Sequence, residues 1–232
     1  MSRSNAGRRT QRAWTWTHGP GASRVRGWIL CYLLRPIVDH YTSPTVMGRE
    51  HLARTQQPVI FAANHASHID TPLLLQSLPE DWRRRTAVAA AADYFFRNAL
   101  LAWAVSLAFG AVPIERHVRL SRGAAKGLND LVRSDLNVLV YPEGTRSRDG
   151  SMGVLRSGAA RLALEREVPL VPIYLTGTHE AMPPGRWWPR RHHATIVFGE
   201  PLVPRAGEEP KSLTVRLQAA LGAMRSSLAK DA

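Results

Sequence analysis

Short, uninterrupted hydrophobic runs recur along this 232-residue chain, and segments with hydrophobic residues at helical spacing separate them. The runs have the length of buried strands, and we expect strands at residues 58–63, 86–92, 111–114, 136–141, 170–175 and 195–198. The intervening segments predict helices at residues 71–78, 94–109, 119–133, 158–166 and 212–228. Because strands alternate with helices, the pattern predicts a single α/β domain with a mostly parallel central sheet flanked by helices.

Two hydrophobic segments contain residues that complicate their assignment. Pro172 lies inside the predicted strand 170–175, and proline suits an edge strand or an entry position because it cannot donate a backbone hydrogen bond. The uncharged stretch 99–114 is interrupted by Gly110 and Pro113, and it falls short of the about 20 apolar residues that a transmembrane helix needs. This stretch is either a buried helix that leads into a strand or a face that dips into a membrane.

The chain is strongly basic, with a formal net charge of +13 at pH 7, and such a charge attracts nucleic acid, anionic lipid head groups or phosphorylated substrates. Residues 1–38 contain no acidic side chain but many basic and aromatic ones, namely Arg3, Arg8, Arg9, Arg12, Arg24, Arg26, Arg35, Trp14, Trp16, Trp28 and Tyr32. This combination is typical of a segment that lies on an anionic membrane surface. A disordered tail followed by an ordinary first helix is the alternative.

The polar sequence Asn-His-Ala-Ser-His-Ile-Asp follows the first predicted strand directly, at positions 64–70. A histidine with a carboxylate five positions later, His65 and Asp70, can form an oriented pair at a strand-to-helix turn. The carboxylate holds one ring nitrogen as a donor, so the other nitrogen is free to accept a proton from a hydroxyl group. In this interpretation, Ser67 bonds the turn and takes no part in the chemistry.

A second polar sequence, Tyr-Pro-Glu-Gly-Thr-Arg-Ser at positions 141–147, follows another predicted strand. Gly144 permits a tight turn, and Arg146 offers a planar set of donors suited to a phosphate group. Glu143 is a candidate to orient the arginine or to bond a substrate hydroxyl. Ligands of such sheets bind beyond the carboxyl ends of the strands, and we therefore expect both polar sequences at one edge, with Arg116 delivered there by the strand 111–114.

In these motifs the chain resembles the glycerolphosphate and lysophosphatidate acyltransferases, the PlsC-like superfamily. The family signature consists of four elements that occur here in the family order over about residues 58 to 180. They are N-H-x-S-x-x-D (Asn64, His65, Ser67, Asp70), G-x-x-x-I-x-R (Gly110, Ile114, Arg116), E-G-T-R-S (143–147) and V-P-[IL]-V-P-[IV] (168–173). The first and third elements together are highly specific.

The resemblance implies a transferase that moves a fatty acyl group from acyl-CoA or an acyl carrier protein to a lysophospholipid hydroxyl. The expected acceptor is 1-acyl-glycerol-3-phosphate, which would give phosphatidic acid. It implies His65 as the general base, Asp70 as the group that orients it, and a set of acceptor-binding residues that consists of Arg116, Glu143, Gly144, Thr145 and Arg146. The acyl thioester is a co-substrate, and neither a metal nor a further cofactor is expected.

The resemblance also implies how the chain is divided and where it acts. Residues 1–45 correspond to the family's helical membrane-docking segment, and residues 46–232 to the acyltransferase domain. The expected location is the cytoplasmic face of the cell membrane, as a peripheral or monotopic protein. The single cysteine, Cys31, excludes an intramolecular disulfide and a cysteine-based zinc cluster, which fits a reducing compartment.

Several alternatives stay open or are disfavoured. Lysophosphatidate-specific members often carry a lysine and a glutamate before the second element, whereas residues 90–96 contain no lysine, so another lipid or glycolipid acceptor stays open. A serine hydrolase built on Ser67 is disfavoured because the chain lacks a Gly-x-Ser-x-Gly nucleophile elbow. A nucleic-acid-binding protein would explain the charge and the arginine- and tryptophan-rich residues 186–191, but no nucleic-acid-binding motif is present, and no nucleic-acid partner is expected.

Overall fold

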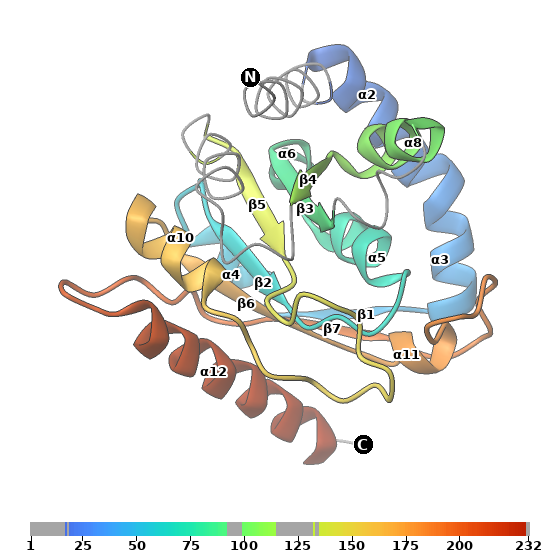
Figure 1. Ribbon diagram of the computed structural model, residues 1–232. Coiled ribbons are helices and arrows are strands. Elements are labelled where there is room, and N and C mark those ends of the chain that lie inside the picture. Colours follow the sequence, from blue (N-terminus) through green and yellow to red (C-terminus); the bar gives the residue numbers. More distant parts are fainter. Residues whose placement is uncertain (1–16, 18, 92–98, 115–131, 133–134, 231–232) are drawn as a thin grey trace, which may run out of the picture.

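In the computed structural model, the described residues are 17, 19–91, 99–114, 132 and 135–230, and they form one sheet of seven strands flanked by helices (Figure 1). The strands are β1 (Thr45–Met47), β2 (Ile60–Ala63), β3 (Thr86–Ala91), β4 (Ala111–Ile114), β5 (Asn137–Val140), β6 (Leu170–Thr176) and β7 (Thr195–Phe198). Their order across the sheet is β1-β7-β6-β2-β5-β3-β4. The predicted helix 119–133 lies almost wholly outside the described residues, and Arg116 lies outside them entirely.

The structure confirms the helices predicted at residues 71–78, 158–166 and 212–228, and it adds β1 and short helices at residues 50–53, 80–84 and 178–181 that the sequence did not predict. Those nearest the amino terminus are α2 (Pro20–Trp28), the π-helix η1 (Ile29–Leu34), α3 (Arg35–Thr42) and α4 (Glu50–Ala53). Further along the chain are α5 (Asp70–Ser77), α6 (Glu80–Arg84), α8 (Ala99–Phe109), α10 (Gly158–Arg166), α11 (Thr178–Ala181) and α12 (Pro210–Lys230). The predicted mostly parallel sheet is confirmed, because every pair of adjacent strands is parallel except β6 with β7.

The sheet has a hydrophobic layer on each face. Because successive side chains of a strand point to opposite faces, Phe61 of β2 packs into one layer while its neighbours Ile60 and Ala62 pack into the other. Helices α10 and α12 cover the second layer, to which α12 contributes buried leucines at a spacing of four residues, Leu213, Leu217 and Leu221. Helix α5 and the N-terminal helices cover the first layer (Figure 1).

The expectation that Pro172 marks an edge strand or a strand entry is wrong. It lies inside β6, which has β2 on one side and β7 on the other. The antiparallel partner accommodates it, because Ile173 pairs with Phe198 while Leu170 bridges to Leu202. The partner therefore carries one extra residue opposite Pro172, and such a bulge is a place where a missing backbone N–H costs little.

The N-terminal helical segment, residues 20–42, packs onto the domain as a run of α2, η1 and α3. Leu30 and Val38 are buried in the hydrophobic layer that also contains α5. Arg26, expected among the membrane-facing basic residues, is instead 2% exposed, and its Nε donates a hydrogen bond to the carbonyl of Leu107 in α8 at 3.2 Å. Its Nη2 donates to the carbonyl of Thr17, and burial lowers the pKa of Arg26 to about 10.

Among the described residues, no helix is both long enough and apolar enough to cross a bilayer. The stretch 99–114 forms α8 followed by β4, which agrees with the interpretation of a helix that leads into a strand.

Candidate active site

The imidazole of His65 lies beside the carboxylate of Asp70, just beyond the carboxyl end of β2. The distance from His65 Nδ1 to Asp70 Oδ2 is 2.8 Å. The Asp70 side chain is fully buried, and that of His65 is 19% exposed. Because a carboxylate only accepts hydrogen bonds, Nδ1 carries the proton in the neutral ring, and Nε2 keeps its lone pair.

The same carboxylate oxygen also organises the loop between the two residues. The backbone N–H groups of Ala66 and Ser67 donate to Asp70 Oδ2 at 2.7 and 2.8 Å. Asp70 is the first residue of α5, where a negative charge is favourable because the helix dipole is positive at that end. The spacing of five residues therefore closes a compact turn around one buried charge, and this turn determines where the imidazole lies.

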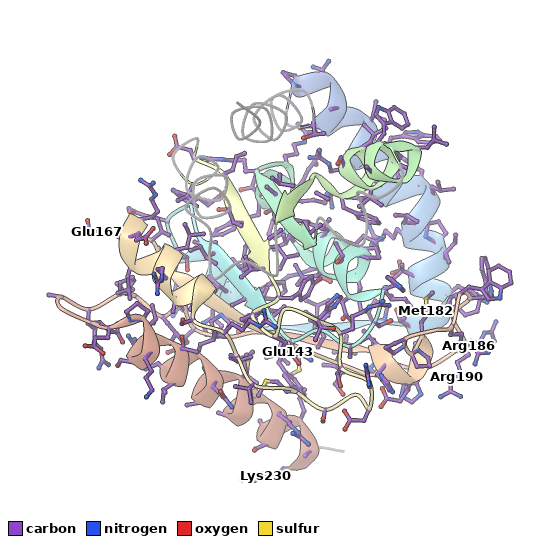
Figure 2. All side chains as sticks on the ribbon, in the orientation of Figure 1. Glu143, Glu167, Met182, Arg186, Arg190 and Lys230 are labelled. Atoms are coloured by element: carbon purple, nitrogen blue, oxygen red, sulfur yellow. The ribbon has the colours of Figure 1, made fainter. Side chains whose placement is uncertain are left out.

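The second polar sequence holds the backbone of His65 from the neighbouring strand. Glu143 lies just beyond the carboxyl end of β5 (Figure 2), and its Oε1 accepts a hydrogen bond from the backbone N–H of His65 at 2.8 Å. Its Oε2 accepts one from the backbone N–H of Gly153 at 2.8 Å. The backbone N–H of Ser147 donates to the carbonyl of His65, also at 2.8 Å. Both backbone groups of His65 are thus bound by a loop that lies about 80 residues further along the sequence.

The ring of Tyr141 stacks on the imidazole of His65. The ring centroids are 3.9 Å apart, and the planes differ by 16°. The Tyr141 hydroxyl lies 2.8 Å from Thr71 Oγ1, and burial together with the nearby Asp70 charge raises the pKa of the phenol. Tyr141 therefore stays neutral and restricts the imidazole to one plane.

Asn64 joins the site to β6, although sequence reasoning had given it no role beyond its place in the motif. Its Nδ2 donates to the carbonyl of Leu175 at 2.8 Å, and its Oδ1 accepts from the Leu175 N–H at 2.7 Å. An asparagine amide pairs with a backbone in this way because it offers one donor and one acceptor side by side. Asn64 thereby continues the β2–β6 pairing one step beyond the last strand residue.

The predicted acceptor-binding residues differ in their surroundings. Arg116 lies outside the described residues. Gly144 forms the turn with a φ of 75°, and its N–H donates to the carbonyl of Tyr141 at 3.0 Å. Thr145 is exposed and Arg146 is half-buried. Glu143 has partners other than those expected, since both of its oxygens accept backbone hydrogen bonds and its side chain is buried.

His68 lies in the same polar sequence as His65, and its surroundings favour the neutral imidazole. Burial, followed by the positive charges of Arg146 and His65, lowers the pKa of His68 to about 4, and Asp70 opposes them. His68 is therefore neutral at pH 7. No sequence signal distinguished His68 from an ordinary loop residue.

Ser67 does not have the geometry of a nucleophile. Its side chain is fully buried, and its Oγ donates to the carbonyl of Met182 at 2.7 Å. The same Oγ accepts a hydrogen bond from the Ile69 N–H at 3.2 Å, so Ser67 bonds the turn as the sequence predicted. Among the described residues, no group of three or more His, Cys, Asp or Glu side chains is placed to hold a metal ion.

Comparison with known proteins assigns the chain to a family. Residues 43–176 match the Acyltransferase family, and this range contains both polar sequences and six of the seven strands. The chain belongs to this acyltransferase family.

Among curated proteins, it is 34% identical over 143 residues to a chloroplastic 1-acyl-sn-glycerol-3-phosphate acyltransferase of Brassica napus, a match that covers 60% of this chain and 39% of that one. It is 33% identical over 162 residues to a 1-acyl-sn-glycerol-3-phosphate acyltransferase of Chlamydomonas reinhardtii, covering 69% and 47% of the two chains. The matched part is thus about half or less of these relatives' length.

A solved structure has the same fold. The crystal structure of the 1-acyl-sn-glycerophosphate acyltransferase PlsC from Thermotoga maritima superposes with a TM-score of 0.69, at 20% sequence identity. The superposition covers 94% of this chain and 83% of the Thermotoga chain, so the shared fold extends well beyond the matched family range.

Proposed function

We propose that the protein transfers a fatty acyl group from an acyl thioester to the free hydroxyl of a lysophospholipid, with His65 as the general base. The acceptor that we propose is 1-acyl-glycerol-3-phosphate, and the product is phosphatidic acid. The observation that carries the proposal is the 2.8 Å contact between His65 Nδ1 and the buried Asp70 carboxylate, because it leaves Nε2 as a proton acceptor.

The proposed reaction needs one base and one leaving group. His65 Nε2 removes the proton from the acceptor hydroxyl, and the oxygen attacks the carbonyl carbon of the thioester. The C–O bond forms as the carbonyl becomes a tetrahedral oxyanion, which then collapses and breaks the C–S bond. The imidazolium returns its proton to the departing thiolate, so an ester and a free thiol leave the site and His65 is neutral again.

The charged neighbours of His65 suit each stage of this reaction. The Asp70 carboxylate stabilises the imidazolium that forms when His65 takes the proton. The positive charge of Arg146, which lowers the pKa of His68, favours an acceptor with a phosphate group. We propose Arg116, Thr145 and the turn at Gly144 as further parts of the acceptor site.

Relatives support the choice of acceptor, since the curated proteins of Brassica napus and Chlamydomonas reinhardtii carry the name 1-acyl-sn-glycerol-3-phosphate acyltransferase. The absence of a lysine at residues 90–96 is the observation that favours a second candidate, transfer to a different lipid or glycolipid hydroxyl by the same mechanism. The donor is acyl-CoA or an acyl carrier protein, and we propose no cofactor beyond it.

A thiol-release assay tests the proposed activity. With a fatty acyl-CoA and lysophosphatidate, we expect the purified protein to release free thiol and to form phosphatidic acid, detected by mass spectrometry. His65→Ala should lower the rate at least 10²-fold, the usual contribution of a positioned base. The matched control is His51→Ala, because His51 lies in α4, next to β1 and away from the catalytic motif.

Three other results of this assay would favour a different activity, acceptor or base. Thiol release that needs no lipid acceptor would indicate a thioesterase. Acylation of another lipid with no product from lysophosphatidate would establish the second candidate. Full activity of His65→Ala would refute the assignment of the base.

We further propose that the protein acts at the cytoplasmic face of an anionic membrane. The N-terminal segment and α8, which contact each other, expose large hydrophobic side chains, namely Trp28, Tyr32, Leu33, Leu100 and Trp103. A cavity of about 330 Å³ between this segment and α6 is lined by basic side chains that include Arg24, Arg83 and Arg84. Aromatic and basic groups together suit the head-group region of a bilayer.

Point substitutions test the membrane proposal more cleanly than a deletion of the segment, because Leu30 and Val38 are part of the core. Replacing Trp28 and Tyr32 together by serine should weaken binding to anionic vesicles without changing the melting temperature by more than about 3 °C. Vesicle binding equal to that of the wild type would contradict the proposal.

A further inference from the structure

A basic and aromatic loop joins α11 to β7 and takes no part in the proposed chemistry. Residues 182–194 contain three arginines, two histidines and two adjacent tryptophans, and they contain no acidic residue. Trp187 is 84% exposed and Trp188 is 48% exposed. Figure 2 shows Arg186 and Arg190 close together at the outer edge of the molecule, near the end of α3.

The loop is held firmly against the end of the N-terminal helical segment. The backbone N–H of His192 donates to the carbonyl of Tyr41 at 2.9 Å, and that of Ala194 donates to the carbonyl of Thr42 at 2.9 Å. Trp188 Nε1 donates to the Tyr41 hydroxyl at 2.9 Å, and the two rings meet edge to face. Trp188 is thus anchored to α3, and this contact presents the neighbouring Trp187 to the outside.

The exposure of Trp187 has no explanation within the fold. A large aromatic ring left in water contributes almost nothing to the stability of the folded chain, although one exposed residue by itself would be unremarkable. Here, however, the ring lies beside Trp188 and among exposed arginines, of which Arg186 donates from Nε to the Trp188 carbonyl at 3.0 Å. Paired tryptophans flanked by arginines combine apolar surface, indole donors and positive charge, the chemistry that the head-group region of an anionic bilayer binds.

The loop is anchored to the end of the helical run that also carries exposed aromatic side chains of the N-terminal segment. Helix α3 continues directly from η1, which carries the exposed Tyr32 and Leu33. Tyr32 and Tyr41, the loop's anchor, are nine residues apart, which is about 13 Å along a helix. The loop and the exposed side chains of η1 are therefore about two and a half helical turns apart along the same helical run.

The root of the loop also contacts the catalytic motif. The carbonyl of Met182 accepts the hydrogen bond from Ser67 Oγ at 2.7 Å, two residues from His65. The loop therefore runs from the turn that holds the general base to the outer edge of the protein.

We propose that residues 183–193 form a second membrane-contact element, which inserts Trp187 and Trp188 at the level of the lipid head groups and sets its arginines against anionic lipid phosphates. This inference rests on the proposed membrane location and deepens it. Contacts at both ends of the segment 20–42 hold the protein in one orientation on the bilayer, with the turn of His65 next to the surface that supplies the lysolipid.

The test measures partitioning of the full-length protein onto vesicles of phosphatidylcholine with 30 mol% phosphatidylglycerol, at low salt. We expect Trp187→Ala to weaken partitioning about tenfold, because most of the ring is free to enter the bilayer. We expect Arg186→Gln to weaken it roughly fivefold, the usual contribution of one arginine near an anionic surface. The matched controls are Val215→Ala on α12 and Arg161→Gln on α10, two exposed positions on the opposite face of the sheet, and neither should change partitioning.

A second readout separates docking from chemistry and from folding. On a short-chain lysophosphatidate that stays monomeric in water, Trp187→Ala should keep its wild-type rate and melting temperature. Wild-type partitioning by both loop variants would overturn the inference and leave the proposed function intact. Loop variants that lose affinity for DNA and keep their affinity for vesicles would also overturn it, in favour of a nucleic-acid surface. The wild-type protein could also prove to transfer no acyl group while the loop variants lose partitioning. That result would support the loop as a membrane contact and refute the proposed activity.

Discussion

Replacing Asp70 by asparagine isolates the contribution of one charge to the proposed reaction. Asp70 Oδ2 accepts hydrogen bonds from His65 Nδ1 and from the backbone N–H groups of Ala66 and Ser67. Asparagine has nearly the same shape, and its carbonyl oxygen can occupy the same position and accept the same bonds. The turn is therefore preserved in Asp70→Asn, and the change removes the negative charge.

The size of the effect follows from Coulomb's law. Two unit charges about 4 Å apart interact by about 4 kcal/mol at an effective dielectric constant of about 20. The partial exposure of the His65 side chain reduces this value, and we take about 3 kcal/mol. Because His65 is charged in the transition state and neutral in the ground state, the loss appears as a roughly 10²-fold lower kcat. The KM for lysophosphatidate should change less than threefold, since Asp70 is buried behind the imidazole.

Steady-state thiol release by Asp70→Asn over a range of lysophosphatidate concentrations, compared with Asp81→Asn on the exposed side of α6, gives both kcat and KM. The control should keep its wild-type rate. The reasoning would be refuted if Asp70→Asn kept more than a third of the wild-type kcat. A large rise in KM at unchanged kcat would equally refute it, because that result would make Asp70 a binding group.

Three further predictions concern the surroundings of the base. Glu143→Gln should lower stability by about 1–3 kcal/mol, measured as a lower urea midpoint, because the amide nitrogen of the new glutamine faces one of the two backbone N–H groups that Glu143 binds. A role in substrate binding alone would instead raise the KM and leave stability unchanged. Because the pKa of His68 is lowered, the unfolded chain binds more protons than the folded chain between pH 6.5 and 4, and the folded state loses stability as the pH falls through this window. His68→Gln should reduce that loss by about 1–2 kcal/mol, as measured by urea titrations at pH 7 and 4.5. Gly144→Ala should destabilise the protein by about 1–2 kcal/mol in thermal unfolding, because the φ of Gly144 is 75°. Gly222→Ala, in open space on α12, should stabilise it by about 0.5–1 kcal/mol. A stabilising Gly144→Ala would contradict the assigned turn.

Features that depend on neighbouring residues in the sequence could be predicted well. Hydrophobic runs and helical spacing are local properties, and they located β4, β7 and α10 to the residue. The His65–Asp70 contact also closes over five residues, so the motif alone indicated that the two groups meet.

Features that depend on contacts distant in the sequence could not be predicted in the same way. Glu143 was predicted to orient Arg146 or to bond a substrate hydroxyl, and nothing in the sequence indicated that it binds the backbone of a residue 78 positions earlier. The stack of Tyr141 on His65 arises because β2 and β5 are adjacent, and their adjacency is decided by the whole sheet. The burial of Arg26 likewise depends on where α8 packs.

The sequence by itself located most of the strands and the longer helices, because hydrophobic period and short-range pairing are set by residues close together in the chain, and it predicted which residues bear the chemistry. The tertiary structure alone decided that Pro172 lies in the middle of the sheet, that Arg26 is withdrawn from the surface, and that the loop with Trp187 lies beside α3. These outcomes depend on packing between elements far apart in sequence, where many weak contacts together select the neighbours of each side chain.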